Sequence, residues 1–394
     1  MGHPDRRTGP CWWGVTVALL GVLLIGCAPS PEMAPPPCLP GGEAIRFLSD
    51  LVAGSEPSRL EPRAATPSRE SIRYGMNGRA YEADLYRGAQ EPLAGILLVP
   101  GAAQQGKDDP RLVALARTLA RARFAVMVPD MTQVRDLKAR PEDVQEIVDA
   151  FTYLVGRADL SPQGRAGLSA HSYAVGPAIL AAMRPEIRDH VRFVQGVGGY
   201  HDLAAVVTYF TTGYFRRRGE TAWRYLAPSQ HGKWTFMLSN ADQFSQEGDR
   251  QAIAAIARRR MAEPGNSIDD LATQLGHEGR AFLSLLDNLD PARTPALLRQ
   301  IPAAMQADLA ALNLASRDLH PLRARLLLVH GVDDSTIPYT ESLALAHAVR
   351  PGQARLFLVR GLSHVDLRGF GVLDHWRLLC AVEALLAERR LDAP

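Results

Sequence analysis

Short, continuous apolar runs alternate with amphipathic segments through residues 71–199 and again through residues 323–394. Residues 95–99 are an unbroken apolar run, and residues 124–130 are apolar up to Pro129 and end in Asp130. Both have the length of a strand buried on both faces. Residues 111–122 and 141–155 carry apolar side chains three and four positions apart, which is typical of a helix with one buried face. Strands that alternate with helices predict a mostly parallel sheet with helices on both faces, so the fold class is α/β.

The remaining elements of the two stretches follow the same pattern. Residues 71–74 and 79–86 flank Asn77-Gly78, a strong turn signal, and predict a hairpin. Further strands and helices are predicted, in chain order, as a strand up to 171, a helix at 175–183, strands at 194–198 and 325–329, a helix at 341–349, a strand at 354–359 and a helix at 375–389.

Between these stretches, residues 200–322 lose the strand-like pattern and become helical. We predict an all-helical insertion between the sixth and seventh strands, with helices at 204–211, 222–226, 252–261, 281–286 and 303–312. The insertion is rich in aromatic residues near its start. Their helical spacing, as from Tyr209 to Phe215, favours a core inside the insertion over the wall of a ligand pocket.

The first 27 residues have the composition of an export signal. Arg6 and Arg7 precede an apolar run at 11–26, which is shorter than the ~20 residues of a membrane span. The run ends in Leu24-Ile25-Gly26-Cys27, which resembles the lipobox of bacterial lipoproteins. That resemblance implies that Cys27 becomes the lipid-modified N-terminus, and Ala28 after it implies the outer membrane, facing the periplasm. Plain secretion and a retained helix are the alternatives.

Residues 28–70 are predicted to connect this anchor to the folded body. Residues 28–42 are rich in proline and predict an extended tether, 43–53 have the apolar spacing of a short helix, and 54–69 are typical of a linker. In an exported protein Cys38 and Cys380 are able to pair. We favour the alternative, in which Cys380 is a small buried apolar residue and Cys38 a free thiol.

Composition limits the partners. The chain of 394 residues has 46% apolar residues, and its 44 Lys and Arg nearly balance its 42 Asp and Glu. This is enough apolar material for a large core, and the formal charge of +2 favours no nucleic-acid partner. No group of His, Cys and acidic residues has the spacing of a metal site, so we predict neither metal nor cofactor. The oligomeric state is left open.

Three residues in a fixed order carry the candidate chemistry. Ser172 follows a predicted strand and precedes a predicted helix, Asp334 lies in Leu-Leu-Val-His-Gly-Val-Asp-Asp-Ser-Thr-Ile-Pro, and His364 follows the last strand in Gly-Leu-Ser-His. At these residues the chain resembles the α/β-hydrolase family, whose catalytic triad appears in the order Ser, acid, His. The family usually has G-x-S-x-G around its serine, whereas this chain has alanine at 170 and 174.

The resemblance implies a role for each residue. Ser172 is the nucleophile, His364 the general base and acid, and Asp334 the carboxylate that orients the histidine. The competing interpretation of Ser172 is an ordinary helix N-cap. Asp333 competes with Asp334 but is out of register with the motif, and His171 and His330 are interpreted as packing or hydrogen-bonding residues.

The family's oxyanion hole combines two backbone N–H groups. By register these are the N–H of Tyr173, after the nucleophile, and that of Ala102, in the turn after the third strand. Tyr200, which follows the sixth strand at the same edge of the sheet, is predicted to be a wall of the substrate pocket.

The sequence therefore predicts a membrane-anchored serine hydrolase that cleaves carboxylic esters, with a small-molecule or lipid ester as substrate. One alternative is a hydrolase-like lipoprotein without activity that serves as a binding or scaffold module. The alanines at 170 and 174 support this alternative. A serine peptidase or thioesterase on the same fold is a further alternative. The expected organisation is a signal peptide at 1–27, a tether at 28–70, core segments at 71–199 and 323–394, and the insertion, a helical lid, at 200–322.

Overall fold

The computed structural model describes residues 38–54, 66–364, 366–367, 369 and 371–390. The export signal and Cys27 lie outside these residues, so the prediction of a lipid anchor stays a prediction. No helix in the described part of the chain is long and apolar enough to cross a membrane.

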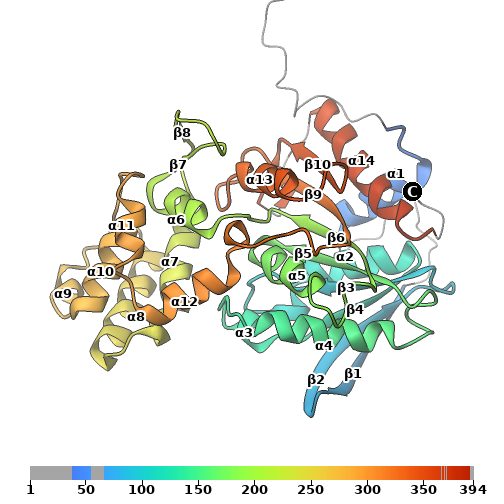
Figure 1. Ribbon diagram of the computed structural model, residues 1–394, viewed down its shortest axis with the longest axis horizontal. Coiled ribbons are helices and arrows are strands. Elements are labelled where there is room, and N and C mark those ends of the chain that lie inside the picture. Colours follow the sequence, from blue (N-terminus) through green and yellow to red (C-terminus); the bar gives the residue numbers. More distant parts are fainter. Residues whose placement is uncertain (1–37, 55–65, 365, 368, 370, 391–394) are drawn as a thin grey trace, which may run out of the picture. The chain divides into compact units, whose positions relative to one another are not determined.

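An eight-stranded sheet forms the centre of the fold (Figure 1). Its eight strands lie in the order β1-β2-β4-β3-β5-β6-β9-β10. The pairs β1/β2 and β2/β4 are antiparallel and the other pairs are parallel. The strands are β1 (Ser68–Met76), β2 (Arg79–Arg87), β3 (Ala94–Val99), β4 (Phe124–Pro129), β5 (Ala166–His171), β6 (Val191–Val197), β9 (Arg325–Gly331) and β10 (Ala354–Val359). The α/β class is confirmed, and this strand order, antiparallel at the start and parallel afterwards, agrees with the predicted α/β-hydrolase fold.

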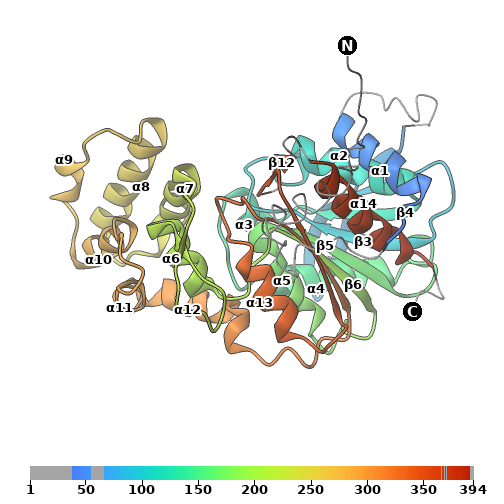
Figure 2. The ribbon, with the colours of Figure 1, turned by 90° about the horizontal axis from the view of Figure 1, so that it is seen from above.

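Helices cover both faces of the sheet, as Figure 2 shows. One face carries α1 (Gly42–Ala53), α2 (Pro110–Arg121) and α14 (Val372–Ala387), and the other carries α4 (Asp143–Val155), α5 (Val175–Ala182) and α13 (Thr340–Ala348). The central strand β3 serves both layers, because Leu97 and Val99 belong to one buried cluster and Ile96 and Leu98 to the other. Side chains alternate along a strand, which is why a strand between two helical layers is apolar throughout.

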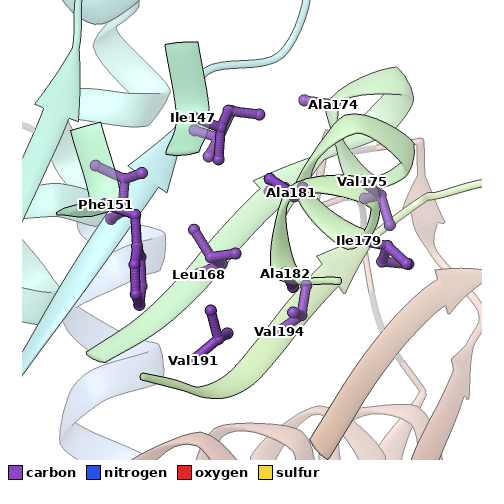
Figure 3. Packing of buried hydrophobic residues seen from close by; sticks show 14 of the residues in the cluster. Ile147, Phe151, Leu168, Ala174, Val175, Ile179, Ala181, Ala182, Val191 and Val194 are labelled. Carbon is purple, nitrogen blue, oxygen red and sulfur yellow. The ribbon is translucent and has the colours of Figure 1, made fainter. Parts of the chain in front are cut away.

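The layer that contains α5 places the end of β5. Ile147 and Phe151 of α4 pack with Leu168 of β5 and Ile179 of α5 (Figure 3), and all four side chains are fully buried. This packing fixes the turn between β5 and α5, the turn that contains Ser172.

The segment between β6 and β9 is mainly helical. It contains α6 (Leu203–Thr212), α7 (Gln230–Ser239), α8 (Glu247–Ala262), α9 (Asp269–Ala272), α10 (His277–Leu286), α11 (Thr294–Leu298) and α12 (Ala303–Leu312). These helices have a hydrophobic core of their own, in which Trp234, Phe244 and Phe282 are buried. The predicted helix at 222–226 is wrong. Those residues include β8 (Arg224–Tyr225), which pairs with β7 (Tyr214–Phe215), and five residues are too few to nucleate a stable helix.

Short elements complete the fold. They are α3 (Thr132–Arg135), the strands β11 (Leu362–Ser363) and β12 (Asp366–Leu367), and 3₁₀ turns at Gly106–Asp108, Ser172–Ala174, Ala241–Gln243 and Leu314–Ser316.

The N-terminal helix corrects one prediction. Cys38 and Cys380 form a disulfide with a Cα–Cα distance of 5.9 Å, so the preference for a free Cys38 was wrong. The sequence did not show that α1 packs against α14, which is what brings the two thiols together. Cys380 is fully buried, as expected, but as one half of a cross-link.

Candidate active site

Three loops at the carboxyl edge of the parallel strands bring Ser172, Asp334 and His364 together. Ser172 directly follows β5, Asp334 follows β9, and His364 follows β10 and β11. The Nε2 atom of His364 lies 2.8 Å from Oγ of Ser172, and its Nδ1 atom lies 2.9 Å from Oδ2 of Asp334. This is the connectivity that a nucleophile, a base and an orienting acid require. Residues separated by 192 and 30 positions thus form one chain of hydrogen bonds.

The backbone at Ser172 has a positive φ of 56°, in the left-handed region that non-glycine residues rarely adopt. A helix N-cap residue normally has an extended backbone and donates no hydrogen bond to a distant histidine. Ser172 instead forms a sharp strand-to-helix turn that directs Oγ toward His364. This geometry separates Ser172 from the N-cap interpretation.

The two alanines fit the turn. Ala170 and Ala174 are both buried, with exposed fractions of 0% and 1%, and both belong to the cluster that includes α4 and α5. Their methyl groups therefore pack in the core, and the departure from the family's glycines does not prevent the strained turn.

Asp334 is an acceptor for four groups in a closed environment. Its Oδ1 accepts the backbone N–H of Thr336 at 2.7 Å and that of Ile337 at 3.0 Å, while Oδ2 faces His364 and lies 3.4 Å from Nε2 of His330. Burial alone raises the pKa of this carboxyl. The charge of His364 and the hydrogen bonds with His330 and His364 outweigh burial and hold the pKa of Asp334 well below its usual range. Asp333 accepts the N–H of Gly361 instead.

The two other histidines have structural environments. His330 is fully buried between the hydroxyl of Ser342 at 2.6 Å and the carbonyl of Ile337 at 2.9 Å. Desolvation by the surrounding protein, followed by the charge of His364, lowers the pKa of His171 to about 4. His171 therefore stays neutral beside Ser172 at physiological pH.

Two residues that the sequence analysis did not single out shape the site. Gly198 has a φ of 62°, and a Cβ atom there would lie 3.4 Å from both Oδ2 of Asp334 and Nδ1 of His364. A side chain at 198 would crowd the hydrogen bond between them, and the pair Gly198-Gly199 at a strand end was the available signal. The hydroxyl of Tyr209, on α6, donates a hydrogen bond to the backbone carbonyl of Asp334 at 3.1 Å. This bond connects the helical insertion to the turn that contains Asp334.

The two oxyanion candidates come from the turn after β3 and the turn after β5. The turn that contains Ala102 lines a cavity together with Ser172 and His364. The backbone N–H of Tyr173 follows Ser172 in the first turn before α5. The side chain of Tyr173 is directed away, because its hydroxyl donates to Oδ2 of Asp143 at 2.6 Å. Burial raises the pKa of Asp143 to about 6.

The cavity beside Ser172 has a volume of about 690 Å³. Its walls come from α1, α2, α14 and the ends of the central strands, and none of its lining residues belongs to the described helices between β6 and β9. Tyr200 is not among the lining residues. It is 1% exposed, its hydroxyl donates to the carbonyl of Leu312 at 3.1 Å, and its ring packs against Gly176. The structure thus places Tyr200 in the core between α5 and α12, away from this cavity.

Comparisons with known proteins find similarity among solved structures, at low sequence identity. No protein-family model matches the chain, and no curated protein does. Among solved structures it is similar to a mutant form of the rice cell-wall-degrading esterase LipA of Xanthomonas oryzae, with 14% identity over 84% of this chain and 94% of that one, at a TM-score of 0.47. It is also similar to an esterase of Pyrobaculum calidifontis, with 15% identity over 88% and 90% at a TM-score of 0.45, and to a dienelactone hydrolase of Anabaena variabilis, with 13% identity over 82% and 96% at 0.41. The function proposed below rests on the geometry around Ser172.

Proposed function

We propose that the protein is a serine hydrolase that cleaves carboxylic esters through an acyl-enzyme. The observation that carries the proposal is the strained turn at Ser172, with Oγ 2.8 Å from Nε2 of a histidine whose Nδ1 faces a buried carboxylate. Such strain costs of order 1–3 kcal/mol and is kept mainly where function requires it. A serine that only caps a helix has no need of a hydroxyl hydrogen-bonded to a histidine that is in turn hydrogen-bonded to an aspartate.

The mechanism follows from the hydrogen-bond chain. His364 takes the proton from Ser172 as Oγ attacks the ester carbonyl, and the negative oxygen is held by the N–H groups of Tyr173 and Ala102. The C–O bond to the alcohol then breaks, and the alcohol leaves with the proton from His364. In the second step His364 takes a proton from water, the hydroxide attacks the acyl group, and the C–O bond to Ser172 breaks as His364 returns the proton to Oγ, which releases the acid. Asp334 stabilises the protonated His364 in both steps.

The test is covalent labelling. The protein without its first 37 residues is incubated with a fluorophosphonate, and its intact mass is measured together with those of Ser172→Ala and Ser363→Ala. Ser363, a neighbour of His364, is the matched control for loss of a hydroxyl. We expect one adduct on the wild type and on Ser363→Ala, and none on Ser172→Ala. A folded wild-type protein that forms no adduct would favour the inactive binding module, and Ala170 and Ala174 would then be replaced by glycine.

Enzyme that has not been labelled is then assayed with matched p-nitrophenyl ester, thioester and anilide substrates. We expect the ester to be preferred. Faster turnover of the thioester or the anilide would replace the proposal with a thioesterase or a peptidase.

We further propose that Cys27 carries a lipid anchor and that the enzyme belongs to a bacterial cell envelope, at the outer membrane facing the periplasm. The support is the lipobox-like sequence Leu24–Cys27 after an apolar run. Membrane fractionation of the full chain and of Cys27→Ser in a bacterial host tests this. Loss of the variant from membranes, or a block in its processing, is expected, and a mature variant that still sediments with membranes would contradict the proposal.

A further inference from the structure

We propose that the cavity walled by α1, α2 and α14 binds the aliphatic acyl chain of the substrate, and that the N-terminal helix α1 therefore determines chain-length specificity. The inference rests on the proposed function, because it assigns the cavity next to the proposed nucleophile. Substrate selection would then depend on α1, a helix that precedes the first strand of the sheet in sequence.

The cavity has the lining that an alkyl chain requires. Its apolar lining includes Phe47, Leu48 and Leu51 of α1, Leu115 of α2, and Leu378 and Leu385 of α14. A volume of about 690 Å³ lies in the range of about 300–1,000 Å³ that is usual for small-molecule sites. Leu378 and Leu385 are seven residues apart on α14, so the cavity extends about 10 Å along that helix.

Asp109 and Gln195, two polar residues of the cavity, already have partners. The carboxylate of Asp109 accepts hydrogen bonds from the backbone N–H and the guanidinium of Arg111, the shortest at 2.9 Å. The amide oxygen of Gln195 accepts the hydroxyl of Ser169 at 2.9 Å. An alkyl chain that enters the cavity therefore leaves these groups satisfied, which is the condition for apolar binding beside polar residues.

The cavity includes the proposed reaction centre. Ser172, His364 and the turn that contains Ala102 all line it. In an acyl-enzyme the alcohol departs before water enters, whereas the acyl group stays on Ser172 through both steps. An apolar cavity continuous with Oγ therefore suits the acyl chain better than the alcohol.

α1 is built into this wall by contacts at both of its ends. Near its start, the Cys38–Cys380 disulfide and a hydrogen bond of 3.0 Å from the N–H of Gly41 to Glu383 attach it to α14. Near its end, Asp50 accepts the hydroxyl of Thr118 at 2.7 Å and the guanidinium of Arg121 at 2.5 Å, both on α2. A wall fixed in this way forms the cavity before substrate arrives, which reduces the entropy cost of binding.

Chain-length profiles test the inference. The kcat/KM of the wild type is measured on p-nitrophenyl acetate, butyrate, octanoate and dodecanoate, together with Leu51→Trp and Leu115→Trp, which place a large ring in the cavity. Ile45→Trp is the matched control, because Ile45 lies on α1, is 48% exposed and does not line the cavity. Thermal unfolding and fluorophosphonate labelling show that each variant is folded and has its nucleophile.

We expect the kcat/KM of the wild type to rise about fourfold for each added methylene until the cavity is full, the equivalent of about 0.8 kcal/mol per methylene. Each wall variant should keep its kcat/KM on the acetate within about threefold of the wild-type value. Each should lose at least about tenfold on the octanoate, while Ile45→Trp follows the wild type. Wall variants that are labelled normally and keep the wild-type profile would overturn the inference.

A binding measurement separates this inference from the proposed function. Octanoate is titrated by calorimetry into Ser172→Ala, with and without Leu51→Trp in the same chain. Binding that weakens at least about tenfold with Leu51→Trp supports the cavity even if the wild type hydrolyses no ester, in which case only the catalytic proposal fails. Octanoate that binds both proteins equally, or neither, overturns the inference.

Discussion

Asp334→Asn is the sharpest perturbation of the proposed triad, because the structure decides how the new amide must orient. Oδ1 of Asp334 accepts two backbone N–H groups, from Thr336 and Ile337, and only an oxygen can take that place. The NH₂ group of asparagine therefore replaces Oδ2 and faces Nδ1 of His364. Because NH₂ is a donor, Nδ1 must become the acceptor and the proton moves to Nε2. Nε2 then donates to Ser172 and is unable to accept its proton.

The expected size of the effect follows from this tautomer. A histidine held in the wrong tautomer lowers the rate by about 10³- to 10⁴-fold, which corresponds to about 4–5 kcal/mol of barrier. Folding should change much less, because both backbone hydrogen bonds persist and a buried charge is removed. A change of about 1–2 kcal/mol in the free energy of unfolding is expected.

The assay compares kcat/KM on a short p-nitrophenyl ester for the wild type, Asp334→Asn and Asp333→Asn. Asp333 is the matched control, since its carboxylate accepts the N–H of Gly361 and makes no contact with His364 among the described hydrogen bonds. Asp333→Asn should remain within about fivefold of the wild type, and urea unfolding shows whether each variant is folded. A folded Asp334→Asn that retains a tenth or more of wild-type kcat/KM would rule out this role for Asp334.

Two further predictions concern stability. Cys38→Ser, or reduction of the wild type, should lower the free energy of unfolding by about 2–5 kcal/mol, because the disulfide closes a loop across 342 positions. Equal urea midpoints for the wild type with and without reductant would show that the bond does not form. Burial raises the pKa of Glu341 from 4.5 to about 7, although hydrogen bonds from the N–H groups of His201 and Asp202 oppose the shift. The contribution of Glu341 to the free energy of unfolding is therefore fully present below about pH 4.5 and is lost as the pH rises through about 7. Relative to Glu341→Gln, the wild type should lose about 3 kcal/mol between pH 4.5 and pH 8 in urea titrations, and parallel pH profiles would contradict the assignment.

The insertion illustrates the limits of local patterns. The helices at 204–211, 252–261, 281–286 and 303–312 were predicted within a few residues of α6, α8, α10 and α12. The residues of α7 were not predicted, and the helix at 222–226 was wrong. A short segment takes its conformation from its neighbours, as when β8 pairs with β7, and no local spacing records such a partner.

The site shows the same division. The sequence was sufficient to recognise the order Ser172, Asp334, His364 and the turns that contain these residues. Strand ends, turn residues and motif spacing are local properties of the chain. The turn around Ser172, taken by itself, did not distinguish a nucleophile from an N-cap, and the other turns of the motif favoured the nucleophile. The positive φ and the hydrogen bond to His364 separate the two, and both depend on how β5, β9 and β10 lie side by side in the sheet.

Local patterns in the amino-acid sequence were sufficient for the α/β class, for most strands and helices of the core, and for the three residues of the candidate triad. These follow from the periods of apolar residues and from short motifs, which are fixed within a few positions of the chain. Tertiary packing was needed to establish that Cys38 pairs with Cys380, that Tyr200 is a core residue, and that α1 walls the cavity at Ser172. Each of these is a contact between segments far apart in sequence, and it forms because two helices and a sheet bury their apolar faces together, which no local pattern encodes.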